Sequence, residues 1–186
     1  MTHMTDAKIL ILATDGFEQS ELLRPLDDLK ANGATVHVAT PDGEAITGWD
    51  ENDWGKEVAA DLKLTDVKVE DYHAIVLPGG QINPDVLRQN EDAVALIKSF
   101  ADAGKTVAAI CHAPWLLIEA GIIEGRKATS YPSIATDLKN AGAKWEDSEV
   151  VVDQGIITSR SPDDLEAFVN KIVEEVREGK HDRAAA

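Results

Sequence analysis

Short apolar runs alternate with amphipathic segments along most of the chain. Residues 8–14 are apolar almost throughout, as expected for a strand that is covered on both faces of a parallel sheet, and we expect further strands at 35–40, 74–80 and 106–111. The remaining segments include four with apolar residues at helical spacing, and we expect helices there: 21–33, 91–105, 132–142 and 161–176. Strands that alternate with helices in this way predict an α/β fold, with a mostly parallel sheet sandwiched between helices.

Two stretches depart from this alternation. Residues 41–67 are rich in Gly and Asp, and they predict a small β-excursion after the second strand with no long helix. The excursion carries Trp49 and Trp54, which either cover a sheet edge or form a subunit contact. Residues 148–160 predict a late hairpin that turns near Gln154.

Length and charge limit the organisation and the partners. With 186 residues and 44% hydrophobic residues, the chain fits a single domain over residues 1–186, of which we expect 181–186 to fray. The formal net charge is −16, from 34 acidic and 18 basic residues. This charge repels a phosphate backbone and an anionic lipid surface, so we expect neither nucleic acid nor a membrane as a partner.

The cysteine content indicates a cellular compartment, and the absence of certain motifs argues against some cofactors. One cysteine allows no disulfide within the chain, and the first residues do not resemble a signal peptide, so we expect a reducing, cytoplasmic setting. The longest apolar stretch is interrupted by polar residues, which argues against a membrane span. Because no Gly-rich phosphate loop and no HExxH or CxxC spacing occurs, we expect no cofactor and no metal.

Polar and glycine residues follow three of the predicted strands at their carboxyl ends. In an open parallel sheet, ligands bind at this edge because the loops and the helix N-termini converge there. We therefore expect residues that are distant in sequence to meet at one edge: Asp15, Glu18, Gly79, Gly80, Cys111 and His112.

The only cysteine lies in "TVAAICHAPWLL", residues 106–117, where a strand is predicted to turn into a helix. Such a turn would present Cys111 at a helix N-terminus, which favours the reactive thiolate. It would also direct the N–H group of the next residue at the reacting carbon, and Gly79–Gly80 could supply a second N–H group for an oxyanion hole. The alternative is a buried structural thiol.

Several motifs together resemble the ThiJ/PfpI superfamily, most closely its PfpI branch of intracellular-protease-like proteins. They are "DGFEQSEL", "LPGG", "AAICHAPWLL", "GRKATSYP", "NAGAKWEDSEVVVD" and "ITSRSPDDL", and the match runs from about residue 7 to residue 176. The resemblance implies one domain that is related to class I glutamine amidotransferases, with a flavodoxin-like fold. No distal His-x-Glu pair is present for an amidotransferase triad.

The resemblance also assigns roles to individual residues. Cys111 would be the nucleophile and Glu18 the carboxyl group that is hydrogen-bonded to the thiol. Backbone N–H groups of Gly80 and His112 would form the oxyanion hole. His112 would serve as the base, and Asp85 of a neighbouring subunit would complete the triad in a homodimer or homohexamer.

The chain departs from the family pattern around this site. Ala113 stands where Gly is common, Asp85 stands where Glu is common, and the "QINPD" loop is a residue longer than the usual form. Trp115 stands where a polar residue is frequent, so the rim of the pocket would be more apolar. We expect Gly79, Trp115 and Tyr131 to line the pocket, although Tyr131 also fits a simple position at the end of a strand.

Three functions fit these residues. The first is a Cys-dependent hydrolase of peptides or carbonyl adducts, of the protease or deglycase type, that acts in stress protection. The second is a glutathione-independent glyoxalase that converts methylglyoxal to lactate at the same cysteine. The third is a non-enzymatic redox sensor or chaperone in which Cys111 is oxidised. We expect the first, with a small carbonyl or peptide substrate.

Overall fold

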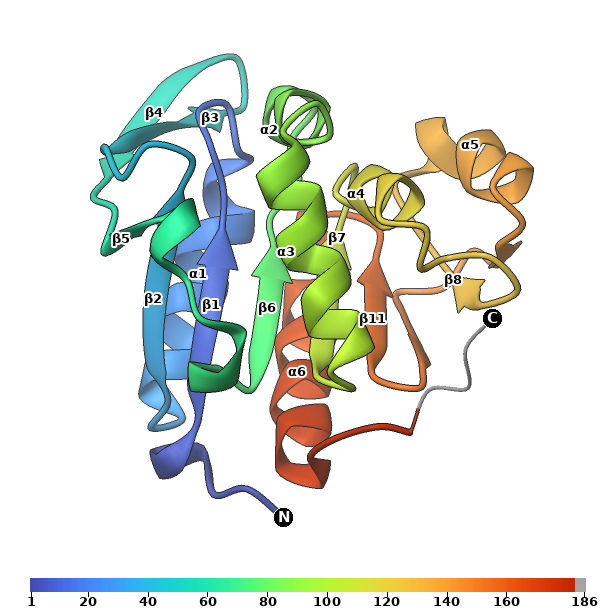
Figure 1. The fold of residues 1–186 in the computed structure, drawn as a ribbon. Coiled ribbons are helices and arrows are strands. Elements are labelled where there is room, and N and C mark those ends of the chain that lie inside the picture. Colours follow the sequence, from blue (N-terminus) through green and yellow to red (C-terminus); the bar gives the residue numbers. More distant parts are fainter. Residues whose placement is uncertain (183–186) are drawn as a thin grey trace.

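The computed structural model describes residues 1–182, and they form a seven-stranded sheet between two layers of helices (Figure 1). The strands of this sheet lie in the order β10-β11-β7-β6-β1-β2-β5. All neighbouring strands run parallel except β10, which pairs antiparallel with β11. The bounds of these strands are β1 (Lys8–Leu12), β2 (Thr35–Thr40), β5 (Leu62–Lys63), β6 (Ala74–Leu77), β7 (Thr106–Ile110), β10 (Val150–Asp153) and β11 (Ile156–Ser159). The prediction of an α/β sandwich with a mostly parallel sheet is confirmed.

Six α-helices belong to the described part of the chain. They are α1 (Gln19–Ala31), α2 (Ile82–Leu87), α3 (Glu91–Asp102), α4 (Pro114–Glu119), α5 (Ala135–Asn140) and α6 (Leu165–Glu178). Because side chains alternate along a strand, β1 directs Ile9 and Ile11 to one face of the sheet and Leu10 and Leu12 to the other. The first face is covered by α1 and α6, and the second by α3 and α4. Both faces of the central strands are therefore buried, which explains their almost continuous apolar runs.

The β-excursion is a separate antiparallel hairpin of β3 (Ile46–Asp50) and β4 (Asp53–Val58). Trp49 and Trp54 face each other across it with their ring centroids 5.5 Å apart, and Trp54 remains 53% exposed. The hairpin is joined to the loop after β1, because the N–H group of Trp49 donates to the carbonyl oxygen of Phe17 at 2.7 Å. It therefore rises beside the carboxyl end of the sheet (Figure 1).

The late hairpin is also confirmed. It turns at Gln154 and Gly155, which have φ values of 50° and 76°. A further short parallel pair, β8 (Lys127–Ala128) with β9 (Lys144–Trp145), lies outside the main sheet. No sequence pattern that we considered predicted this pair.

Several boundaries differ from those predicted. The helix expected from residue 21 begins at Gln19, and the helix expected over 132–142 is a 3₁₀ turn followed by the short α5. Helix α2 forms within a segment that we read as a loop. Its first turn carries Pro84, whose missing N–H group costs nothing there.

The end of the chain is only partly described. Residues 183–186 of the segment expected to fray lie outside the described residues, whereas the N–H group of His181 donates to the carbonyl oxygen of Gly104 at 2.8 Å. No helix within residues 1–182 has the length and apolar character needed to cross a membrane.

Candidate active site

Three loops meet at the carboxyl end of the parallel strands, as the sequence predicts. The N–H group of Glu18, after β1, donates to the carbonyl oxygen of Gly79, after β6, at 3.3 Å. A Cβ atom placed on Gly79 would lie 2.6 Å from the Cβ atom of Cys111, and one on Gly80 would lie 2.7 Å from the carbonyl oxygen of Gly16. Only glycine allows such a close approach of the three loops.

Cys111 lies at a sharp turn between β7 and α4. Its φ of 64° is in the left-handed region, which is rare for residues other than glycine and stores strain. Two backbone hydrogen bonds hold this conformation: the N–H group of Cys111 donates to Ser159 at 3.0 Å, and its carbonyl oxygen accepts from Tyr131 at 2.8 Å. The residue is 6% exposed. The predicted elbow is therefore present.

The carboxyl group beside the thiol belongs to Glu21, and the assignment of this role to Glu18 is wrong. Glu21 is fully buried, it interacts with the Cys111 side chain, and its Oε2 accepts a hydrogen bond from the N–H group of Gly79 at 2.8 Å. Glu18 is half-buried, precedes α1, and accepts a hydrogen bond from the Ser20 hydroxyl at 3.0 Å.

The phase of α1 explains this correction. Residues 21, 25 and 29 are buried because they recur every four positions on the face that packs against the sheet. Glu21 thus occupies a core position at the start of an apolar stripe, and this is the signal that could have identified it. The sequence predicts a helix over 21–33, whereas the family resemblance assigns the carboxyl role to Glu18.

Burial sets the protonation of this pair of side chains. Burial, with a further contribution from the nearby charge of Glu18, raises the pKa of Glu21 to about 8. Burial also raises the pKa of the Cys111 thiol, and a charge on Glu21 adds to this effect. Hydrogen bonds from the N–H groups of Gly80 and His112 lower it. At neutral pH, Glu21 therefore holds a proton and Cys111 is a thiol.

This result reverses the expectation that the turn alone would favour a thiolate. Helix α4 has only six residues and begins three positions after Cys111, so its dipole acts weakly on the sulfur. The backbone N–H groups of Gly80 and His112, which were predicted to form an oxyanion hole, do reach the sulfur. They remain available to stabilise negative charge that develops next to it.

His112 connects the thiol to a residue that sequence reasoning missed. Its Nδ1 lies 3.1 Å from the sulfur of Cys111, and its Nε2 lies 3.0 Å from the hydroxyl oxygen of Ser133. Burial lowers the pKa of His112, so the ring is neutral at neutral pH. A neutral ring that accepts the thiol proton at Nδ1 carries its own proton at Nε2, which then donates to Ser133.

Two of the predicted pocket residues pack against this imidazole ring. Tyr131 stacks on it with centroids 4.7 Å apart, and Trp115 contacts it with centroids 5.3 Å apart. The indole N–H group of Trp115 donates to Asp137 at 2.8 Å, and the guanidinium of Arg88 lies 5.1 Å from the ring centroid. Trp115 is thus fixed as an apolar wall beside His112. The third predicted pocket residue, Gly79, packs directly against Cys111.

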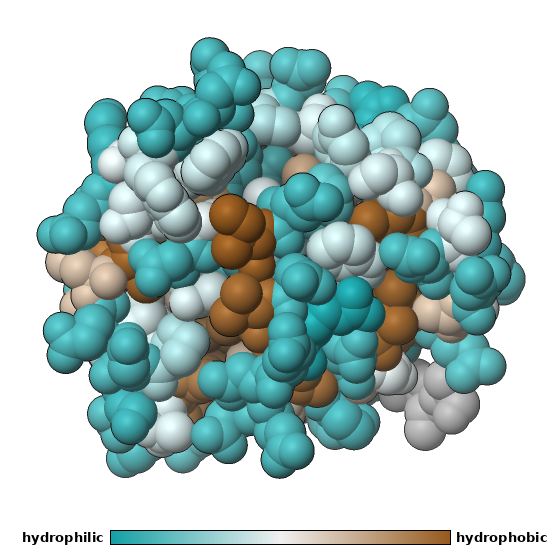
Figure 2. Space-filling model, turned by 90° about the horizontal axis from the view of Figure 1, so that it is seen from above, coloured by the Kyte–Doolittle hydropathy of each residue, from teal (hydrophilic) through white to brown (hydrophobic). Residues whose placement is uncertain are grey.

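Asp85 is not brought to His112 within this chain. It lies exposed on α2, between Ile82 and Val86, which are 41% and 49% exposed. Figure 2 looks onto this face and shows apolar side chains gathered within a hydrophilic surround. A triad that includes Asp85 of a second subunit stays a prediction.

Asn83 is a further residue of the site that the sequence did not reveal. It is fully buried, and its Oδ1 accepts a hydrogen bond from the N–H group of Thr14 at 2.8 Å. Its Nδ2 donates to the carbonyl oxygens of Pro78 and Gly79 at 2.8 and 3.2 Å. Asn83 therefore ties the loop after β1 to the Gly79–Gly80 loop.

Side chains able to hold a metal ion also gather away from Cys111. Within residues 1–182, a group of three such side chains, Glu175, Glu178 and His181, comes within 4.8 Å. It lies at the end of α6, and the candidate active site uses none of these residues.

Comparisons with known proteins agree with this geometry. Residues 7–175 match the model of the DJ-1/PfpI family. The deglycase TK1284 of Thermococcus kodakarensis is 46% identical over 170 residues, which cover 91% of this chain and 99% of that protein. The putative cysteine protease YraA of Bacillus subtilis is 41% identical over 87% of this chain and 93% of that protein.

A solved structure gives the same result at the level of the fold. The crystal structure of DJ-1beta of Drosophila melanogaster aligns with a TM-score of 0.82 and 31% identity, over 93% of this chain and 95% of that chain. The match over nearly the whole length and the arrangement around Cys111 lead to the same conclusion: the chain belongs to the DJ-1/PfpI family.

Proposed function

We propose that the protein is a cysteine-dependent hydrolase of the deglycase type, which removes small carbonyl adducts from amines and thiols. The observation that carries this proposal is the strained Cys111, whose sulfur lies 3.1 Å from a neutral imidazole nitrogen and next to a protonated carboxyl group. A thiol with a base at one side and a proton donor at the other is suited to attack a carbonyl carbon.

The first step follows from the positions of these groups. As the sulfur of Cys111 bonds to the carbonyl carbon, its proton moves to Nδ1 of His112 and the electron pair of the C=O bond moves to oxygen. The N–H groups of Gly80 and His112 stabilise the resulting oxyanion. Protonated Glu21 adds no negative charge and can return a proton to the tetrahedral intermediate. In the complete reaction, a methylglyoxal adduct of an amine takes up one water and yields the free amine and lactate. The hydrogen of the former aldehyde carbon moves to the neighbouring ketone carbon, so the first carbon is oxidised and the second is reduced within the same molecule and no external oxidant is needed.

The walls of the site favour a small substrate group. Trp115 and Tyr131 both pack against His112, and Trp115 is held in place by its hydrogen bond to Asp137. These aromatic rings limit the space next to the base. A three-carbon adduct on an exposed side chain requires less room there than an extended peptide backbone.

The names of the relatives support this choice without deciding it. TK1284 is named a deglycase, and YraA is named a putative cysteine protease. Another relative, from Bacillus subtilis, is named general stress protein 18 and is 42% identical over 163 residues. We therefore propose a role in protection against carbonyl stress, with adduct removal as the activity.

The test is hydrolysis of a preformed methylglyoxal adduct of N-acetylcysteine by the parent protein and by Cys111→Ser. Release of the free thiol and of lactate is followed while an excess of aminoguanidine traps free methylglyoxal. We expect the parent protein to release the thiol faster than the adduct dissociates spontaneously, and we expect Cys111→Ser to show only the spontaneous rate. The sulfur nucleophile is lost, while the fold is retained, because serine is smaller and fits the same position.

Two outcomes would contradict the proposal. If lactate forms only from free methylglyoxal and the trap abolishes it, the protein is a glyoxalase. If neither substrate turns over, the site does not support carbonyl hydrolysis.

A further inference from the structure

The end of α6 lies at the opposite end of the sheet from Cys111. The last helical residue is Glu178, and the next residue, Gly179, turns the chain with a φ of 99°. The N–H group of His181 then donates to the carbonyl oxygen of Gly104, which lies just before β7, whereas Cys111 follows β7. The segment after the helix is therefore fixed against the start of this strand.

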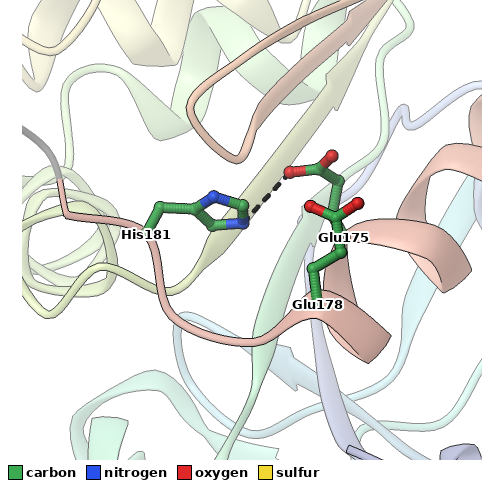
Figure 3. Close-up of side chains that lie close together, drawn as sticks. All are labelled: Glu175, Glu178 and His181. Carbon is green, nitrogen blue, oxygen red and sulfur yellow. Dashed lines mark ion pairs between the residues drawn. The ribbon is translucent and has the colours of Figure 1, made fainter. Parts of the chain in front are cut away.

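This turn brings an imidazole to two carboxylates of the helix. Glu175 and Glu178 are three positions apart in the last turn of α6, so they share one side of the helix. The Nε2 atom of His181 lies 3.0 Å from Oε2 of Glu175, and one ligand atom from each of the three residues lies within 4.8 Å of the others. Figure 3 shows the ring directed at Glu175, with the carboxylate of Glu178 beside it.

Burial makes this arrangement more than a surface cluster. Glu175 is 6% exposed, and the side chain of His181 is 16% exposed. A buried carboxylate needs a hydrogen-bond donor or a cation beside it, and His181 already lies in this position for Glu175. An ion bound between the two side chains would take over that role. The C-terminal end of the helix dipole, together with a net charge of −16, adds to the attraction for a cation.

We propose that Glu175, Glu178 and His181 bind one divalent first-row transition ion, with zinc as the representative ion. Bonds of about 2.0–2.2 Å from one ion place neighbouring ligand atoms roughly 3.0–3.5 Å apart. The 3.0 Å separation of His181 and Glu175 already fits, and the third ligand needs to move by only about 1–2 Å. Glu178 is exposed and can make this movement.

The mixed ligand set decides the class of ion. An imidazole nitrogen with two carboxylates suits zinc, manganese, iron or cobalt, whereas calcium and magnesium prefer oxygen ligands alone. Two basic side chains that oppose a cation lie in this region: Lys180, which is exposed and adjoins His181 in the chain, and Lys105, which is buried and follows Gly104. A bound ion would join α6 to the segment that follows it.

The test is isothermal titration of the full-length protein with Zn²⁺ after removal of metal by a chelator. It is performed in the Cys111→Ser background so that the thiol does not bind the ion. We expect one Zn²⁺ per chain, with affinity at least about tenfold lower in His181→Ala and in Glu178→Gln, because each variant loses a ligand. Both positions lie at the end of the helix or beyond it, so the core is unaffected.

Two variants serve as matched controls. His3→Ala removes a histidine near the same end of the molecule, where the N–H group of Thr2 donates to Arg177. Glu174→Gln removes the same charge from the same helix but at a residue that pairs with Lys171. Both should bind Zn²⁺ as the Cys111→Ser protein does. The absence of saturable binding, or binding that His181→Ala and Glu178→Gln leave unchanged, would overturn the proposal and leave a His–Glu ion pair.

Discussion

At the scale of single residues, the site depends on three side chains that share protons. Cys111, His112 and Glu21 are all mostly buried, and burial disfavours the charged form of each of them. The resting site is therefore close to neutral, and charge develops only as the thiol attacks. Backbone N–H groups of Gly80 and His112 are placed to stabilise that charge.

Ser133 gives a prediction about the orientation of His112. Its hydroxyl oxygen lies 3.0 Å from Nε2 and holds the ring with Nδ1 toward the thiol. Ser133→Ala should lower kcat by roughly 3- to 10-fold with little change in KM, as expected for the loss of one hydrogen bond. Steady-state kinetics on the adduct substrate measure both constants.

Ser133→Thr provides the control, because it keeps the hydroxyl group and should restore most of the turnover. If Ser133→Ala turns over like the parent protein, the stacking of Tyr131 on the ring is enough to hold it.

At the scale of secondary structure, the helix register and a glycine loop bring the residues together. Helix α1 places Glu21 on its buried face, and the loop after β6 places Gly79 against both Glu21 and Cys111. A Cβ atom on Gly79 would lie 2.5 Å from Oε2 of Glu21 and 2.6 Å from the carbonyl oxygen of Ile110. Because the second of these atoms is backbone, a side-chain rotation cannot relieve the clash.

We therefore predict that Gly79→Ala displaces the loop. Its free energy of unfolding should fall by about 1–3 kcal/mol, as for other overpacked positions, and turnover should fall by at least about tenfold. Urea unfolding and turnover per folded molecule are the measurements.

Gly125→Ala is the matched control. Gly125 has a φ of 74°, and a Cβ atom placed on it would meet no atom within 4 Å, so its substitution strains the backbone without a clash. This variant should lose stability but keep its turnover. Equal losses of turnover in both variants would show that Gly79 has no particular role in positioning the site.

The sequence predicted these elements to different degrees. Strands such as β1 and β7 were evident because they are apolar on both faces, and the hairpin of β10 and β11 was evident from its turn residues. Glu21 was missed because a charged residue was not expected on the buried face of α1, although its spacing from Pro25 and Leu29 places it there. Ser133 was missed because its contact with His112 spans 21 residues and arises only from tertiary packing.

At the scale of the whole molecule, the sheet explains why the site forms where it does. The central strands β1, β6 and β7 are adjacent and parallel, so their following loops emerge together at one edge (Figure 1). The start of α1 and the turns after β6 and β7, which are separated by roughly 30 to 60 residues in the chain, thereby contribute Glu21, Gly80 and Cys111 to one site. The proposed metal site uses the other end of the molecule, so the two sites can be tested separately.

The measurement that tests the central claim most directly is the pH dependence of adduct hydrolysis in the parent protein, Glu21→Gln and Glu18→Gln. Glu21 has a raised pKa, so it is protonated below about pH 8 and loses its proton above that value. The account predicts that kcat/KM of the parent protein falls as the pH rises through about 8. This alkaline decrease should disappear in Glu21→Gln, because the amide cannot ionise.

Glu18→Gln should remain active, with the alkaline decrease moved to lower pH, because the charge of Glu18 helps to raise the pKa of Glu21. Two results would contradict the account: an alkaline decrease that remains in Glu21→Gln, or a loss of turnover in Glu18→Gln while Glu21→Gln stays active. The second result would assign the role of the thiol's partner to Glu18.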